Sequence, residues 1–130
     1  MTLKTAVPDL LREFPELKAP CDKEFYYYGD EVPDAYPVFS TILRPAAFAA
    51  IDRQDEVAIR RFLDFYERVA ADPDDDVNAL THIELIEQLA NDPRRLQLAW
   101  PYMGEHTREQ ARVYARESKR QFGKEVWLPE

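Results

Sequence analysis

Cysteine is nearly absent from this sequence, and long apolar runs are absent altogether. The single cysteine, Cys21, permits no internal disulfide, which suits a reducing compartment. No apolar run approaches the ~20 residues of a membrane span, so we expect no membrane partner. The first residues also lack the unbroken apolar core and small-residue cleavage site of a secretion signal. These absences predict a soluble, cytoplasmic protein.

The recognisable catalytic motifs are missing as well. The sequence has no Gly-x-Ser-x-Gly, no glycine-rich phosphate loop and no Cys-x-x-Cys. The two histidines, His82 and His106, form no His-x-x-x-His pair for a metal, and no base for Cys21 can be identified. We therefore predict a protein that is not an enzyme and that uses no cofactor and no metal. One alternative stays open, an acid–base site of Glu87 and a histidine, which needs the two within hydrogen-bond reach in an open pocket.

An acidic run in the middle of the chain partly fits a calcium-binding loop. Asp72, Asp74 and Asp76 would occupy positions one, three and five. Val77 stands where the sharp turn at position six needs glycine, and Ile83 stands where position twelve needs a bidentate glutamate. We therefore interpret the run as a helix connector whose carboxylates cap the next helix. The run also offers a partner's lysines a docking edge, formed by Asp74, Asp75 and Asp76.

Negative charge is in excess, but it is not spread evenly. The net charge of -8 divides into -4 for residues 1–40, -6 for residues 41–91 and +2 for residues 92–130. Such an excess repels nucleic acid and anionic membranes and favours a basic partner, mainly through association rate and specificity. The same charge also has a plain interpretation as a source of solubility. We expect no nucleic-acid partner.

Helical spacing of apolar residues dominates most of the chain. Ile59, Phe62, Leu63 and Tyr66, for example, follow the i, i+3, i+4, i+7 pattern of a core-facing helix. Similar patterns predict helices over residues 3–14, 38–51, 55–71 and 77–91, a fifth from 93 and a last one from 107. Valine and isoleucine never alternate with polar residues over a strand's length. The predicted fold is all-α, one domain over residues 1–130 with five to six sequential, mostly antiparallel helices.

Two boundaries of these helices depend on particular residues. Pro45 lacks the N–H that would bond back to Thr41, so we expect it to kink or split its helix. Thr107 followed by Gln110 has the spacing of a capping box and predicts the start of the last helix. Residues 123–130 follow that helix as a C-terminal tail.

Arginine recurs every four residues along the last helix and builds a basic stripe. Its members are Arg108, Arg112, Arg116 and Arg120. The stripe could grip phosphate or meet another copy's acidic face. Three glutamates each stand three residues before one of these arginines, so we favour ordinary surface pairs.

Glu87 is the one carboxylate that a helical wheel places on an apolar face. At 100° per residue it falls between Leu80 and Ile83. A buried charge is costly unless it is paired. We therefore expect an ion pair with an arginine of a neighbouring helix, such as Arg44 or Arg61, and keep an acid poised in a cleft as the alternative.

One stretch, residues 18–37, has neither helical nor strand periodicity and is predicted to be a long irregular connection. Phe25 and Phe39 are expected to anchor its ends in the core. Its middle mixes tyrosines with carboxylates, a composition that suits a surface for a basic partner. Long irregular segments inside compact domains are often functional. The predicted contact residues are Tyr26, Tyr27, Tyr28, Asp30, Glu31, Asp34 and Tyr36.

Three short stretches carry a resemblance to known proteins: "FPELK", "VNALTHIELIEQL" and "YMGEHTREQ". With them the chain resembles a family of small helical bacterial proteins of unknown function that are similar to immunity proteins encoded beside polymorphic toxins. The resemblance implies no catalytic residues. It implies a dedicated binder that inhibits a toxin domain, often by covering its active site. The alternative function is a helical adaptor or homo-oligomer with no toxin partner.

Overall fold

The computed structural model describes all residues, 1–130, and contains helices but no strands. The helices are α1 (Leu3–Glu13), α2 (Lys18–Glu24), α3 (Ala35–Val38), α4 (Arg44–Asp52), α5 (Glu56–Ala70), α6 (Asp75–Thr81), α7 (Glu87–Ala90), α8 (Pro93–Ala99) and α9 (Glu105–Phe122). A π-helical turn at Phe39–Leu43 joins α3 to α4, and another at His82–Ile86 joins α6 to α7. Counting each joined pair once gives seven helices. The all-α prediction is confirmed, and the predicted count of five to six is too low.

The additional helix, α2, lies inside the stretch that the sequence predicted to be irregular. Leu17, Cys21 and Phe25 are all buried and follow one another at intervals of four residues, so one face of the turn packs on the core. Pro20 lies in the first turn of α2, where a missing N–H costs no helical hydrogen bond. The tyrosines and acids that follow α2 have no such spacing, so this short apolar pattern was not recognised as a helix.

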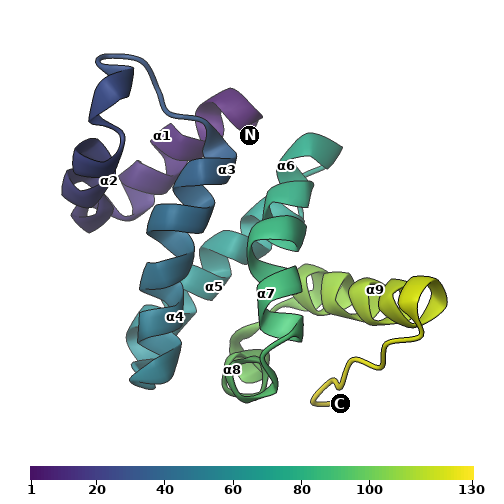
Figure 1. Cartoon of the computed structure of the whole chain (residues 1–130). Coiled ribbons are helices and arrows are strands. Elements are labelled where there is room, and N and C mark those ends of the chain that lie inside the picture. Colours follow the sequence, from purple (N-terminus) through teal and green to yellow (C-terminus); the bar gives the residue numbers. More distant parts are fainter.

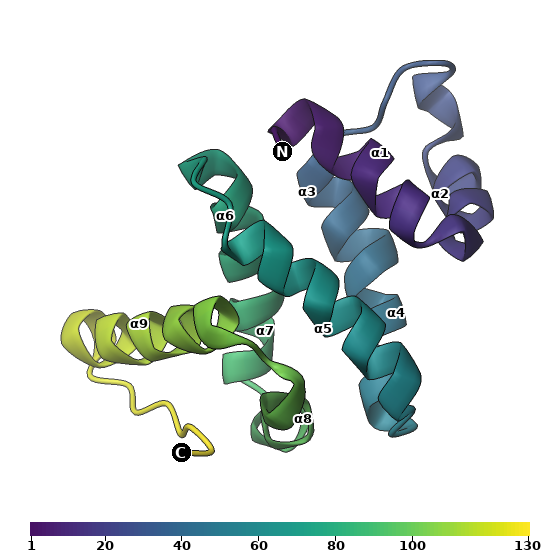
Figure 2. The same ribbon diagram turned by 180° about the vertical axis from the view of Figure 1, so that it is seen from behind.

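The core is one continuous cluster of 31 buried residues to which every helix contributes. Figures 1 and 2 show α5 crossing the molecule, with α1 to α4 on one side of it and α6 to α9 on the other. α5 therefore supplies the largest buried face, including Phe62, Leu63, Phe65 and Tyr66. No helix of the structure combines the length and the apolar character that crossing a membrane requires.

The expected interruption at Pro45 takes the form of a π turn. The backbone N–H of Arg44 donates to the carbonyl of Phe39, five residues back. Pro45 follows within the first turn of α4, where no backbone donor is required. The chain from α3 to α4 therefore stays helical through the proline instead of splitting in two.

The second π turn changes which residues face the core between α6 and α7. It adds a residue to the turn and so rotates everything after it relative to a regular helical wheel. Within the turn Ile83 is 38% exposed, while Ile86 at its end is buried. Glu87 is half-buried, and the prediction that it lies between Leu80 and Ile83 on an apolar face is wrong.

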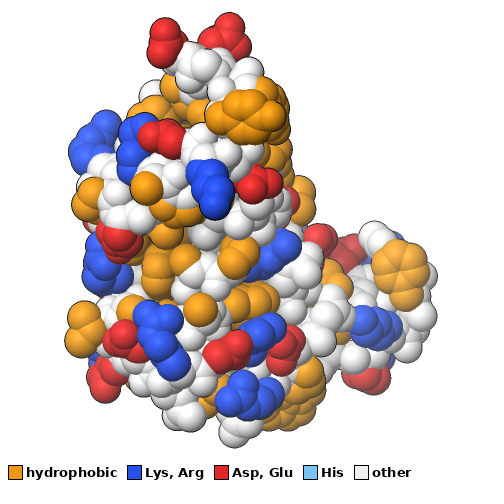
Figure 3. Space-filling model, turned by 60° about the vertical axis from the view of Figure 1, so that its left-hand side comes forward, with side chains coloured by type: hydrophobic (Ala, Val, Ile, Leu, Met, Phe, Trp, Pro, Cys, Tyr) orange, Lys and Arg blue, Asp and Glu red, His pale blue; other side chains and the backbone are white.

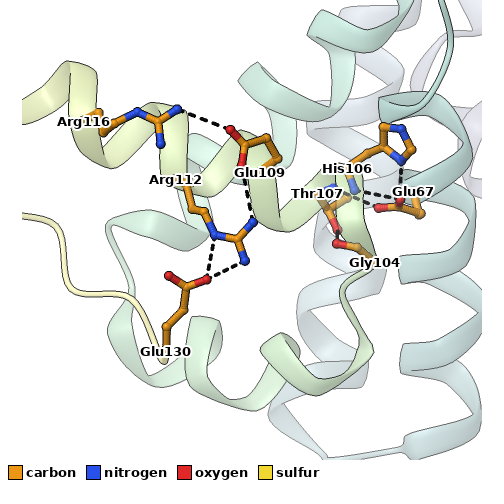
Figure 4. Close-up of polar contacts among 8 residues, drawn as sticks. All are labelled: Glu67, Gly104, His106, Thr107, Glu109, Arg112, Arg116 and Glu130. Carbon is orange, nitrogen blue, oxygen red and sulfur yellow. Dashed lines mark hydrogen bonds and ion pairs between the residues drawn. The ribbon is translucent and has the colours of Figure 1, made fainter.

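The start of α9 is set by a carboxylate from another helix. α9 begins at Glu105, two residues before the predicted capping box at Thr107, and its N-cap Gly104 has no side chain to offer. Glu67 of α5 accepts hydrogen bonds from the backbone N–H of His106 at 2.9 Å and of Thr107 at 2.8 Å (Figure 4). A tertiary contact therefore replaces the predicted local cap.

Candidate functional site

The three consecutive tyrosines form a short 3-10 turn, Tyr26–Tyr28, directly after α2. The side chains of Tyr26 and Tyr27 are 78% and 68% exposed, whereas Tyr28 packs partly against the core. Ring centroids lie 5.7 Å apart for Tyr26 and Tyr27 and 5.0 Å apart for Tyr27 and Tyr28. Tyr28 in turn contacts the buried ring of Phe25 at 6.0 Å, edge to face. The row of rings therefore runs outward from the core, which is an ordered way to present aromatic surface.

A tight turn and one hydrogen bond shape the segment that follows. Gly29 has a positive φ of 62°, a conformation that residues with a side chain rarely adopt. The hydroxyl of Tyr28 donates to the carboxylate of Asp34 at 3.3 Å and spans the turn. Asp34 itself precedes α3, whose first residue, Ala35, is buried. Both ends of the turn are thus attached to the core, and Asp30 and Glu31 between them are exposed.

The predicted anchors of this region are both confirmed. Phe25 is 6% exposed, and Phe39 is fully buried against Phe65 and Tyr66. Of the predicted contact residues, Tyr28 and Tyr36 are half-buried and pack on the core, so they support the surface more than they form it. We call residues 26–36 the tyrosine–acid segment. Figure 3 shows acidic and aromatic side chains together at the top of the molecule, where this segment lies.

The carboxylates predicted to meet a partner are all among those that the protein leaves unpaired. Of the 25 Asp and Glu side chains, 15 take part in an ion pair within the chain. Ten remain, and six of them belong to the two predicted acidic regions: Asp30, Glu31, Asp34, Asp74, Asp75 and Asp76. The negative charge of these two regions is therefore not neutralised internally.

The second acidic region lies at the start of α6. The carboxylate of Asp74 accepts from the backbone N–H of Asp76 at 2.9 Å and caps the helix, as the sequence predicted. Asp75 accepts from the side-chain amide of Asn78 at 3.2 Å. Burial raises the pKa of Tyr36, and the nearby carboxylate of Asp76 raises it further. The second acidic region therefore acts electrostatically on a residue of the first.

A hollow of about 870 Å³ lies between the tyrosine–acid segment and the first turn of α1. Val32, Pro33 and Tyr36 line one side of it, and Leu3 and Lys4 line the other. In Figures 1 and 2 the chain entering α3 passes beside this end of α1. The sequence interpretation assigned neither Leu3 nor Val32 to the site. Leu3 belongs to the apolar pattern of the helix predicted over residues 3–14, and Val32 lies in a stretch without periodicity, yet both are exposed.

The arginine stripe of α9 is engaged within the chain. Glu109 pairs with Arg112 and with Arg116, both at 3.3 Å, and Arg112 also binds Glu130 of the tail (Figure 4). Arg120 pairs with Glu117. These contacts support the structural interpretation of the stripe, with surface pairs of small individual energy.

Arg108, the first arginine of the stripe, does not form a surface pair like the others. Arg108 donates to the backbone carbonyl of Trp100 at 2.7 Å, and its guanidinium lies over the Trp100 ring at 5.1 Å from the centroid. It forms no ion pair with Glu105. Arg108 therefore fastens α9 to the end of α8 instead of facing solvent with the other arginines.

The ion pair expected for Glu87 is not formed. Arg44 binds Glu84 instead, at 3.1 Å from its carboxylate and 3.0 Å from its backbone carbonyl, and Arg61 binds Glu16. Glu87 and His82 both line a hollow of about 420 Å³ beside α9, but no hydrogen bond or ion pair joins them. The condition set for an acid–base site of these two residues is therefore not met in this structure.

The fold and this site together describe an acidic, all-α protein with unpaired carboxylates and exposed tyrosines at one end. The chain belongs to the family described as "Domain of unknown function (DUF7674)", whose model matches residues 7–122. That range contains both predicted acidic regions. A search among curated proteins found no match, and neither did a search among solved structures. The family description assigns no function, so the resemblance to immunity proteins stays a prediction.

Proposed function

We propose that this protein is an immunity-type binding protein, which neutralises a basic bacterial toxin domain by direct contact and performs no catalysis itself. The tyrosine–acid segment forms the centre of the contact surface. Residues 74–76 form a second edge. A bound toxin domain would be covered over its own functional surface, as the resemblance to immunity proteins implies.

The observation that carries this proposal is the coincidence of unpaired carboxylates with exposed tyrosines. Asp30 and Glu31 have no internal cation, and Tyr26 and Tyr27 expose most of their rings beside them. Like charges held together gain most from a partner that brings lysine or arginine. Tyrosine adds contact area with few rotatable bonds and a polar tip. Together these groups suit a basic protein surface better than any small ligand.

Rigidity also supports the proposal. The row of tyrosine rings packs on buried Phe25. The hydrogen bond between Tyr28 and Asp34 closes the turn that carries the exposed acids. A surface that is already ordered loses little conformational entropy when a partner binds. This is the property that tight inhibition of another protein requires.

Co-expression with the product of the adjacent gene tests the proposal directly. We expect that product to arrest growth when it is expressed alone. Growth should return, and the two proteins should co-purify, when this protein is present. A chain with alanine at Tyr26 and Tyr27 serves as the matched control and should rescue growth less well. A neighbouring gene product that is harmless and does not bind would contradict the proposal.

The alternative, a helical adaptor or homo-oligomer, is favoured by a different observation. Phe122 at the end of α9 is 78% exposed, and Trp127 in the tail is also exposed, although Leu128 packs against the core. Exposed aromatics of this kind suit contact with another chain. Light scattering across salt concentrations separates the two functions, because a monomer at every salt level argues against self-association.

A further inference from the structure

The hollow beside the tyrosine–acid segment combines apolar walls with an acidic rim. Its walls come from the apolar side chains of Leu3, Val32 and Pro33 and from the ring of Tyr36. Leu3 and Val32 are two of the few large apolar side chains that the molecule leaves exposed. The hollow therefore offers apolar surface that no element of this chain covers.

Two carboxylates lie at this apolar surface without cations of their own. Glu31 and Asp34 both line the hollow, and neither forms an ion pair. Asp76 acts electrostatically on Tyr36, which forms part of the wall. One cation, Lys4, also lines the hollow, and it forms no ion pair either. The net charge at the rim is therefore negative, although Lys4 offsets part of it.

We propose that this hollow receives an arginine side chain of the partner protein, an inference that rests on the proposed function and names the residue the partner must supply. The three methylenes of arginine match the apolar walls, and its guanidinium reaches the rim. There the planar group pairs with Glu31 and Asp34 and stacks on the ring of Tyr36.

Arginine fits this arrangement better than lysine for two reasons. A guanidinium presents donors in a fixed plane, so it can serve two carboxylates and an aromatic face at once, whereas an ammonium is a compact, strongly hydrated charge. Arginine is also among the residues that dominate binding energy at protein interfaces. Lys4 repels the incoming cation, so its neutralisation should strengthen binding.

Titration of the isotope-labelled full chain with N-acetyl-arginine amide, followed by NMR, tests the assignment without the toxin. We expect saturable shifts at the backbone amides of Leu3, Val32 and Ala35. The neutral isostere N-acetyl-citrulline amide should bind about fivefold more weakly, because its ion pairs with the rim carboxylates are lost. E31Q/D34N should weaken arginine binding by a similar factor, and K4Q should strengthen it about twofold. Circular dichroism melting checks that the variants stay folded.

Three outcomes would overturn the assignment. Citrulline amide could bind as well as arginine amide, N-acetyl-lysine amide could bind equally well, or the shifts could cluster at residues 74–76 instead of at the hollow. The proposed function is judged separately. A toxin that binds E31Q/D34N with unchanged affinity refutes the arginine pocket alone. The absence of any toxin complex refutes the proposed function, while the titration still reports on the hollow.

Discussion

The carboxylate of Glu67 accepts a hydrogen bond of 2.8 Å from the backbone N–H of Thr107, forty residues along the chain. Its second oxygen accepts from the N–H of His106 at 2.9 Å, and the imidazole of His106 lies at 2.8 Å from the same oxygen. A carboxylate of α5 thus satisfies two free donors at the start of α9 and opposes the positive end of the helix dipole. The placement of α9 depends on this contact.

We expect Glu67→Gln to lower the free energy of unfolding by about 1–2 kcal/mol, the range for loss of a good helix cap. The amide keeps the shape of the side chain but loses its charge and turns an NH₂ group toward a backbone donor. Urea denaturation measures the effect. Asp64→Asn on the same helix removes an exposed, unpaired carboxylate and should change stability by less than about 0.5 kcal/mol. Equal effects of the two substitutions would show that Glu67 is not a cap.

Gly104 is required because Glu67 lies against it. A Cβ at position 104 would stand 2.5 Å from the carboxyl carbon of Glu67, closer than real contacts allow. Gly104→Ala should therefore cost about 1–3 kcal/mol in the native protein, the usual range for overpacking. In a Glu67→Ala background the obstacle is gone, and the same substitution should cost clearly less. Additive effects in this double-mutant cycle would contradict the contact.

The same carboxylate predicts part of the acid sensitivity of the fold. Burial tends to raise the pKa of Glu67, but hydrogen bonds from the N–H groups of Thr107 and His106 outweigh it and lower the pKa below its usual value. Its stabilising contribution is complete above the unfolded-state pKa of about 4.3 and is lost as the pH falls through the lower folded-state pKa. The stability difference between the native protein and Glu67→Gln should therefore shrink below about pH 4. A difference that is constant between neutral and acid pH would contradict this mechanism.

If the proposed function holds, reversing two unpaired carboxylates should slow binding of the proposed toxin partner. D30K/E31K removes negative charge from the tyrosine–acid segment, and we expect the association rate to fall about tenfold at low ionic strength and less at high salt. D64K/E105K changes the net charge by the same amount at exposed, unpaired acids outside that segment. Stopped-flow or surface plasmon resonance compares the two. If both variants slow association equally, net charge alone is responsible and the segment is not the site.

Tyrosine substitutions separate binding from folding. Tyr26→Ala and Tyr27→Ala remove side chains that are mostly exposed, so the free energy of unfolding should change by less than about 0.5 kcal/mol. Affinity for the proposed toxin partner should fall about tenfold for each, as expected for aromatic residues at the centre of an interface. Phe122→Ala removes an equally exposed ring from α9 and should leave toxin affinity unchanged. If only Phe122→Ala lost affinity, the interface would instead lie at the other end of the molecule.

Much of the fold could be predicted, because long amphipathic helices carry a strong periodic signal. The stripe of Ile59, Phe62 and Tyr66 placed α5 correctly, and all three are buried. α2 was missed because a seven-residue helix shows only two or three apolar positions, too few to stand out beside three tyrosines. The helical wheel placed Glu87 wrongly because it assumes a regular helical repeat, and the π turn at His82–Ile86 breaks that repeat.

The candidate site could be predicted in composition but not in shape. Tyr26, Tyr27, Asp30 and Glu31 are exposed, as expected of residues that folding does not explain. Nothing in their spacing indicated that Leu3, from the start of the chain, would face the segment across a hollow. Contacts between residues far apart in the sequence produce no periodic pattern from which a single sequence could predict them.

The sequence by itself determined the helical class, the acidic character of the first two-thirds and the composition of the tyrosine–acid segment. These are local or additive properties, set by side-chain periodicity and charge. Only the tertiary structure decided where α9 begins, which arginines bind acids of other helices and which carboxylates are left unpaired. The deciding contacts join residues tens of positions apart, such as Glu67 and Thr107 or Arg44 and Glu84, and packing alone brings such groups together.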